Sequence, residues 1–141
     1  MIRELFGLAR HVPEILQSER AECGLACIAM IAAYHGHDVD LPTLRQRFAF
    51  SALGATLREV VEVAGRLDMS SRAVKAPLDA LGKLKLPAIL HWDFNHFVVL
   101  TKITSDGAFW IHDPAIGRQR RIKPFGPWRW EPLLHDRCTQ H

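Results

Sequence analysis

A long apolar run near the start of the chain gives the first structural prediction. Nearly every position from Cys23 to Tyr34 is apolar, and the run is rich in alanine, which favours an α-helix. A helix that is apolar all round is buried on most of its sides. The run therefore predicts a central buried helix that begins at a cysteine and ends before Gly36.

Two further helices are expected before the middle of the chain. The first carries Pro42 in its first turn, and the second opens with a capping-box pattern from Thr56 to Glu59. Their apolar positions recur at helical spacing and are Leu41, Leu44 and Phe48, then Val60, Val61, Val63, Ala64 and Leu67. Ahead of all three, residues 1–16 suggest a short lead-in helix that stops before Pro13.

Beyond residue 70 the pattern changes to short apolar runs separated by turn residues. The predicted strands are 71–76, 87–92, 96–103, 108–112 and 118–122. Residues 77–84 are expected to form a helical turn or two. Asp106 and Gly107 are a hairpin signal, and further turns are expected at 93–95 and 113–117.

Helices first and antiparallel strands afterwards predict an α+β fold. Residues 124–141 contain several Pro, Trp and Arg residues and show no periodicity, so no element is predicted there. No internal repeat or low-complexity tract interrupts the chain.

Composition narrows the class of protein. The 141 residues suit one domain with a real core, and 48% hydrophobic and 23% charged residues indicate a globular chain. The net charge of +3 is too small to predict nucleic-acid binding. Three cysteines, an odd number, favour a reducing compartment over a disulfide scaffold. The chain has no apolar run of membrane-spanning length and no apolar signal core, so a cytoplasmic location is expected.

The candidate chemistry centres on Cys23, because a cysteine attacks as its thiolate and the positive end of a helix macrodipole favours an anion. His96 begins an apolar strand directly after a turn, where its imidazole could act as the general base. Asp113 lies 17 residues later, beyond a hairpin, where it could orient that ring. Gln17, shortly before the cysteine, could stabilise an oxyanion with its amide and the Cys23 N–H.

Each of these residues also has a purely structural interpretation. Cys23 could be a small buried hydrophobe, His96 a strand-edge histidine, Asp113 a turn residue and Gln17 a solvated amide. Cys27 is expected in the core, because its spacing to the histidines near residue 36 matches no zinc pattern. Packing or surface roles are expected for Trp92, Phe97, Cys138 and the basic stretch 118–123. No metal site is predicted, and nothing calls for an organic cofactor.

Four motifs in order then make a resemblance specific, and the resemblance spans residues 12–123. The motifs are Gln17 with Glu22-Cys23-Gly24 to Gly36, Gly54 to Leu57, His91 to Leu100, and His112 to Gly117. Together they resemble the N-terminal peptidase domain of bacteriocin-processing ABC exporters, and most closely that of colicin V-type exporters.

The resemblance implies a papain-like cysteine peptidase that cuts a secreted peptide precursor after a double glycine at the end of its leader. It maps the nucleophile to Cys23, the base to His96, the orienting acid to Asp113 and the oxyanion donor to Gln17. The implied partners are the leader peptide and the membrane and ATP-binding domains of an exporter, at the cytoplasmic face of the inner membrane. The alternatives are a non-catalytic leader- or cargo-binding module and a different papain-like amide hydrolase.

Two departures from the family pattern concern the ends of the domain. The membrane and ATP-binding domains are not in this chain, so an excised domain, a stand-alone peptidase or a truncated product is expected. After Lys123 the family continues with a short helix and an apolar strand, whereas 124–141 resembles a replaced or frameshifted end. We therefore expect a peptidase domain at 1–123, an atypical tail at 124–141, and a sheet edge or a core face left uncovered.

Overall fold

The computed structural model describes residues 11–48, 50, 54–74, 78–92, 96–122, 130–132 and 137–138. Its helices are α2 (Cys23–Tyr34), α3 (Leu41–Arg47), α4 (Leu57–Arg66) and the 3₁₀ helix η1 (Leu78–Lys83). Its strands are β1 (Met69–Ser70), β2 (Ala88–Trp92), β3 (His96–Ile103), β4 (Ala108–Asp113), β5 (Gly117–Ile122), β6 (Trp130–Pro132) and β7 (Arg137–Cys138).

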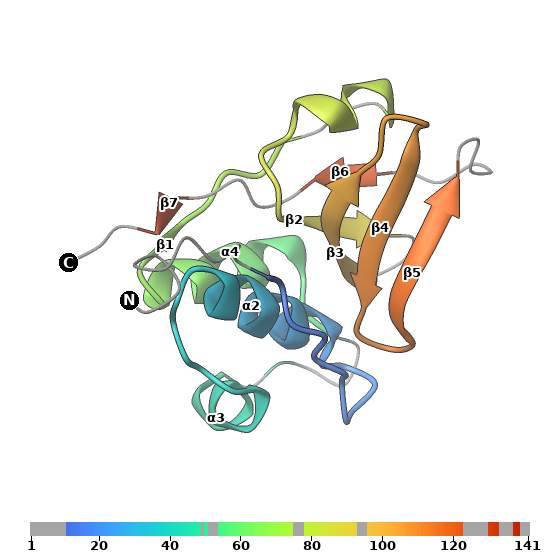
Figure 1. Ribbon diagram of the computed structural model, residues 1–141. Helices are drawn as coiled ribbons and strands as arrows, with labels where there is room; N and C mark the ends of the chain where they lie inside the picture. Colours follow the sequence, from blue (N-terminus) through green and yellow to red (C-terminus); the bar gives the residue numbers. More distant parts are fainter. Residues whose placement is uncertain are drawn as a thin grey trace, which may run out of the picture.

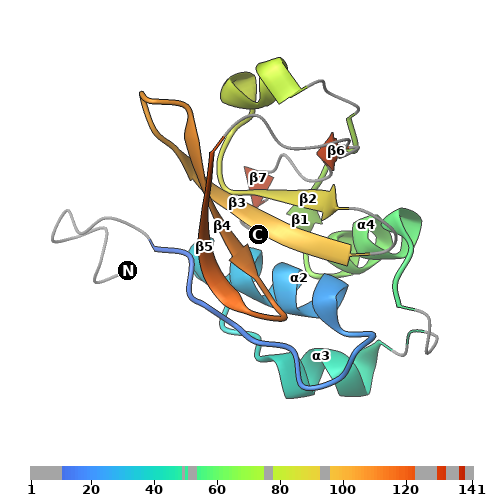
Figure 2. The ribbon, with the colours of Figure 1, turned by 90° about the vertical axis from the view of Figure 1, so that its right-hand side faces the viewer.

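An antiparallel sheet of five strands, in the order β5-β4-β3-β2-β6, is the centre of the fold. The helices α2, α3 and α4 lie on one side of this sheet and η1 lies on the other (Figures 1 and 2). Successive side chains of a strand point to opposite faces of the sheet, so each strand contributes apolar residues to both faces. Phe97 and Val99 face the three helices, whereas Val98 and Leu100 pack with Leu81 of η1. The predicted α+β class is confirmed.

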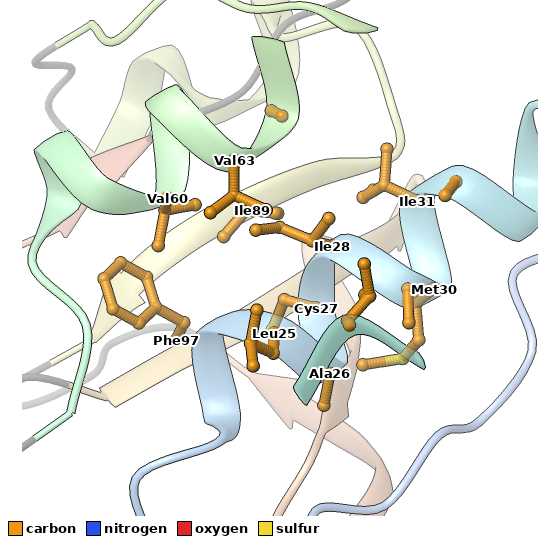
Figure 3. Packing of buried hydrophobic residues seen from close by; sticks show 14 of the residues in the cluster. Leu25, Ala26, Cys27, Ile28, Met30, Ile31, Val60, Val63, Ile89 and Phe97 are labelled. Atoms are coloured by element: carbon orange, nitrogen blue, oxygen red, sulfur yellow. The ribbon is translucent and has the colours of Figure 1, made fainter. Parts of the chain in front are cut away.

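The helix α2 is buried as its sequence predicts. Ten of its twelve residues, Cys23 to Ala32, are buried, and its side chains pack between α4 and the sheet (Figure 3). Such a helix gains its stability from tertiary packing and not from a polar outer face. In the part of the chain that the structure describes, no helix is both long and apolar enough to cross a membrane.

The helix ends follow their sequence signals. Asp40 caps α3 by accepting a hydrogen bond from the Thr43 N–H at 2.8 Å, and the Thr56 hydroxyl caps α4 by accepting one from the Glu59 N–H at 3.2 Å. Gly36 follows α2 with φ +85°, a left-handed conformation that glycine adopts without steric cost. The predicted starts of α3 and α4 and the end of α2 are confirmed.

The strand predictions need corrections. The predicted strand 71–76 is wrong, because residues 71–74 are not in a strand and the short strand β1 precedes them. Its pairing partner is β7, at the far end of the chain, so local pattern could not locate it. The edge of β2 is not left uncovered, since β6 pairs with it. For the lead-in helix expected in residues 1–16 before Pro13, residues 1–10 lie outside the described residues and residues 11–16 are not helical. The expected turn at 93–95 also lies outside the described residues.

We predict that Ile28→Ala lowers the free energy of unfolding by about 2–5 kcal/mol, because Ile28 is 0% exposed and its loss leaves a cavity in the core. Ile116→Ala removes the same atoms from a side chain that is 58% exposed and should change stability by less than about 0.5 kcal/mol. Chemical denaturation measures both, and equal effects would contradict the central place of α2 in the core.

Candidate active site

Cys23 is the first residue of α2, and it is 3% exposed. The next residue, Gly24, lets the head of the helix approach its neighbours closely. A Cβ added at Gly24 would lie 3.1 Å from the Val60 side chain and 3.2 Å from that of Ala55. The first N–H groups of an α-helix have no partner within the helix, so the sulfur lies beside backbone donors and the positive end of the helix dipole.

His96 and Asp113 meet at the ends of neighbouring strands. His96 is the first residue of β3 and Asp113 the last of β4, and His96 Nε2 lies 2.8 Å from Asp113 Oδ1. Both side chains are largely shielded, with 29% and 14% exposure. A carboxylate at this distance accepts the Nε2–H bond and holds the ring, which leaves Nδ1 for another partner.

Cys23 is a second hydrogen-bond partner of His96. The hydrogen bond with Asp113 raises the pKa of His96 most, a hydrogen bond with Cys23 raises it next, and burial lowers it, for a pKa of about 9. The structure thus brings Cys23, His96 and Asp113 together in that order. A folded-state pKa above 6.5 means that the imidazolium stabilises the fold fully below pH 6.5, and that this stabilisation is lost as the pH rises through about 9.

Asp113 remains a carboxylate in this setting. Burial raises its pKa, but the hydrogen bonds from His96 and from the Ala115 N–H, together with the charges of His96 and Arg121, bring the pKa below 3.8. The Ala115 N–H lies 2.9 Å from Asp113 Oδ1. The residue is therefore both the turn residue of the structural interpretation and the partner of the histidine.

Gln17 lies in the segment that leads to α2. Its backbone N–H donates to the carbonyl of Pro114 at 2.9 Å, so it lies next to the turn that follows Asp113. Its side-chain Nε2 donates to the carbonyls of Glu19 and Arg20 at 3.1 and 3.3 Å. The side-chain amide is therefore held by backbone carbonyls of its own loop.

Cys27, His112 and His91 lie near α2 and are held by packing or by backbone contacts. Cys27 is 0% exposed, and burial raises the pKa of its thiol well above 9.0, so the expectation that it belongs to the core is confirmed. His112 is buried and its Nδ1 lies 3.2 Å from the Pro13 carbonyl, while burial lowers its pKa. His91 stacks on Phe97 at 4.7 Å between ring centres.

One residue pair beside the site has no role in the sequence-based hypothesis. Glu22, directly before Cys23, is buried and forms an ion pair with Arg45 of α3. A carboxylate next to a buried apolar helix is a signal for such a pair, since buried charges need partners. The partner, one of several exposed polar residues on α3, could not be chosen from sequence.

A cavity of about 410 Å³ lies elsewhere, at the other end of α2. It is lined by residues that include Tyr34, Lys102, Trp110 and Arg118, and by none of the four candidate residues. The chemistry indicated by Cys23, His96 and Asp113 therefore belongs to the head of α2 and not to this cavity.

A cysteine at the head of a buried helix, facing a histidine–aspartate pair on an antiparallel sheet, is the arrangement of papain-like cysteine peptidases. The model of the peptidase C39 family matches residues 11–123. The chain belongs to this family, and the family predicted from the four motifs is confirmed.

Two relatives from Escherichia coli show how much of a longer protein the chain matches. It is 51% identical over 110 residues to the probable microcin-H47 secretion/processing ATP-binding protein, covering 78% of this chain and 16% of that protein. It is also 51% identical over 108 residues to the colicin V secretion/processing ATP-binding protein, covering 77% and 15%. The chain spans about a sixth of the length of these relatives.

Solved structures agree on the fold. A crystal structure of a double glycine motif protease from an AMS/PCAT transporter, in complex with the leader peptide, matches with a TM-score of 0.75 at 30% identity. The match covers 88% of this chain and 94% of that one. The peptidase domain of Streptococcus ComA matches with a TM-score of 0.72 at 23% identity, and here the likeness concerns the fold alone. The predicted papain-like peptidase fold is confirmed.

We predict that Asp113→Asn lowers the pKa of His96 from about 9 by at least about 1 unit, because the Asp113 hydrogen bond is the largest cause that raises it. NMR titration of the His96 ring measures the shift. Asp106→Asn is the matched control, since that exposed carboxylate pairs with Arg120 instead and should leave the His96 midpoint in place. An unchanged midpoint in Asp113→Asn would contradict the coupling.

Proposed function

We propose that this domain is a cysteine endopeptidase that removes the leader from secreted peptide precursors of the bacteriocin or microcin kind, cutting after a double glycine. The observation that carries the proposal is the series Cys23–His96–Asp113 at the head of α2, with a 2.8 Å contact between the last two. Membership of the peptidase C39 family and the likeness to a double glycine motif protease crystallised with a leader peptide support the substrate class.

The four candidate residues take distinct roles in this reaction. His96 accepts the thiol proton of Cys23, and its raised pKa favours the imidazolium. The sulfur attacks the carbonyl carbon of the second glycine, and a tetrahedral oxyanion forms. Its collapse breaks the peptide bond while His96 returns the proton to the leaving amine, which leaves a thioester. Water, activated by His96, then hydrolyses the thioester and frees the leader. Asp113 orients His96 throughout.

Gln17 is the proposed side-chain donor to the oxyanion, together with the Cys23 backbone N–H. Its place in the loop before α2, tied to the Pro114 carbonyl, supports this role. The amide Nε2 carries two protons and contacts two backbone carbonyls, so donation to an oxyanion requires it to release one of them. Loss of one such donor lowers kcat by roughly 10²–10³-fold.

The requirement for two glycines has a simple physical reason. Cys23 is 3% exposed, so a substrate carbonyl reaches the sulfur through a narrow approach, and residues without side chains pass it most easily. The leader itself would bind separately, through the apolar face of an amphipathic helix.

The assembly is part of the proposal. The relatives are ATP-binding proteins for secretion and processing, so we place this domain, residues 1–123, at the cytoplasmic face of the inner membrane. Its partners there would be the membrane and ATP-binding domains of an ABC exporter and the leader of the exported precursor. Residues 124–141 form the atypical tail of this arrangement.

We predict that the wild-type chain converts a double-glycine precursor into two products cut after the second glycine, and that Cys23→Ala forms none. Mass spectrometry identifies both products and the cut position. Cys27→Ala is the matched control, because it makes the same change one helical turn away in the core and should keep most of the cleavage. A precursor left whole by the wild type would refute the peptidase function.

We also predict that Cys23→Ala still binds the leader peptide with a Kd within about threefold of the wild-type value, because leader docking does not involve the sulfur. Calorimetric titration measures both constants. Loss of binding by the folded variant would contradict a separate docking surface. Binding by the wild type without cleavage would identify a leader-binding module instead, and cleavage of substrates without paired glycines would identify a different amide hydrolase.

A further inference from the structure

The pair Glu22–Arg45 lies directly beside the nucleophile. The side chain of Glu22 is 6% exposed and that of Arg45 42%. Arg45 Nε donates to Glu22 Oε1, and Arg45 Nη2 donates to Glu22 Oε2 at 3.1 Å. This is the two-point geometry in which a guanidinium grips a carboxylate most specifically. The contact with Arg45 lowers the pKa of Glu22 most, against the effect of burial, so Glu22 is ionised at neutral pH.

The carboxylate of Glu22 does not cap the helix that it precedes. Glu22 occupies the N-cap position of α2, yet its side chain accepts no hydrogen bond from the first turn. It points back along the chain, where Oε2 accepts hydrogen bonds from the Ser18 and Glu19 N–H groups, both at 3.1 Å. The group therefore shapes the loop before α2 and does not act as a cap.

That loop carries the proposed oxyanion donor. Glu22 binds the N–H groups of Ser18 and Glu19, while the Gln17 amide binds the carbonyls of Glu19 and Arg20. The two side chains thus hold the same short stretch of backbone, Glu22 through its N–H groups and Gln17 through its carbonyl groups. Since α3 holds Glu22 through Arg45, the position of the Gln17 amide depends on a residue of α3.

We propose that Glu22 and Arg45 are positioning residues for the peptidase reaction. They hold loop 17–22 so that the Gln17 amide and the head of α2 both face the carbonyl oxygen of the substrate peptide bond that is cut. This inference rests on the proposed function. Arg45 also balances the Glu22 charge, since an unpaired buried carboxylate one residue from Cys23 would oppose a second negative charge there.

Cleavage and alkylation separate this role from a structural one. Peptide cleavage passes through an oxyanion, whereas alkylation of a thiolate by iodoacetamide forms none. We expect Glu22→Gln, which keeps the shape and removes the charge, to lower kcat about 10–100-fold with KM within about threefold. Its rate of Cys23 alkylation should stay within about threefold of wild type. Arg45→Lys, which keeps the positive charge but loses the two-point contact with the carboxylate, should lower kcat less than Arg45→Gln does.

A double-mutant cycle tests whether Glu22 acts through Gln17. In the Gln17→Ala background, Glu22→Gln should lower kcat by less than about threefold, because the amide that it positions is gone. Arg58→Ala, which breaks the exposed Arg58–Glu62 pair on α4, is the control variant and should keep wild-type kcat. Thermal unfolding of every variant is measured beside the kinetics.

The possible results are distinct. The positioning role would be overturned if Gln17→Ala and Glu22→Gln each lowered kcat as much in the double variant as alone. It would also be overturned if Glu22→Gln lowered the rates of cleavage and of alkylation equally and lowered the Tm. If Glu22→Gln does not fold, the same comparison is made with Arg45→Lys and Arg45→Gln. An active wild type with an unchanged Glu22→Gln kcat refutes this inference alone, whereas a wild type that cuts no double-glycine precursor refutes the proposed function and this inference with it.

Discussion

The packing of α2 against β3 is the interaction on which the rest of the structure depends. Leu25, Ile28 and Ala29 are buried in one core with Phe97 and Val99 of the central sheet. Because these residues are fully buried and packed together, they fix the head of the helix relative to the start of the strand. Cys23 and His96 occupy those two places, so their meeting is a consequence of core packing. Sites built on helices and strands hold their groups more precisely than sites on loops.

The register between β3 and β4 supplies the next constraint. Val99 pairs with His112, and His96 and Asp113 lie an odd number of residues from that pair, three and one respectively. Their side chains therefore leave the same face of the sheet. A slip of one residue would turn Asp113 to the opposite face. The irregularity between Leu100 and Lys102 lies farther along the hairpin and leaves this relation intact.

Polar contacts complete the site where the regular elements end. The segment before α2 is tied to the β4–β5 turn through the Pro114 carbonyl and to α3 through the Glu22–Arg45 pair. A loop held on two sides can present an amide in a fixed place, which an unsupported loop cannot. The rigid elements thus place the nucleophile and the base, and the polar contacts place the groups around them.

The sequence by itself determined the parts of this protein that depend on neighbouring residues. The apolar run of α2, the Pro42 in the first turn of α3, the cap Thr56 and the bounds of β3 all follow from local pattern. The ordered motifs also identified the family, since they record residue types at fixed spacing. The triad was proposed from the same motifs, and its spacing of 17 residues between His96 and Asp113 suits a hairpin.

Only the tertiary structure decided the features that join distant parts of the chain. Residues 69–70 form strand β1 because β7 pairs with them. Strand β6 pairs with the edge of β2 although residues 130–132 show no strand pattern. Glu22 forms its ion pair with Arg45, which lies 23 residues further along the chain. Backbone pairing and buried charge pairs need a partner whose position follows from the whole fold, so no local signal in either segment predicts them.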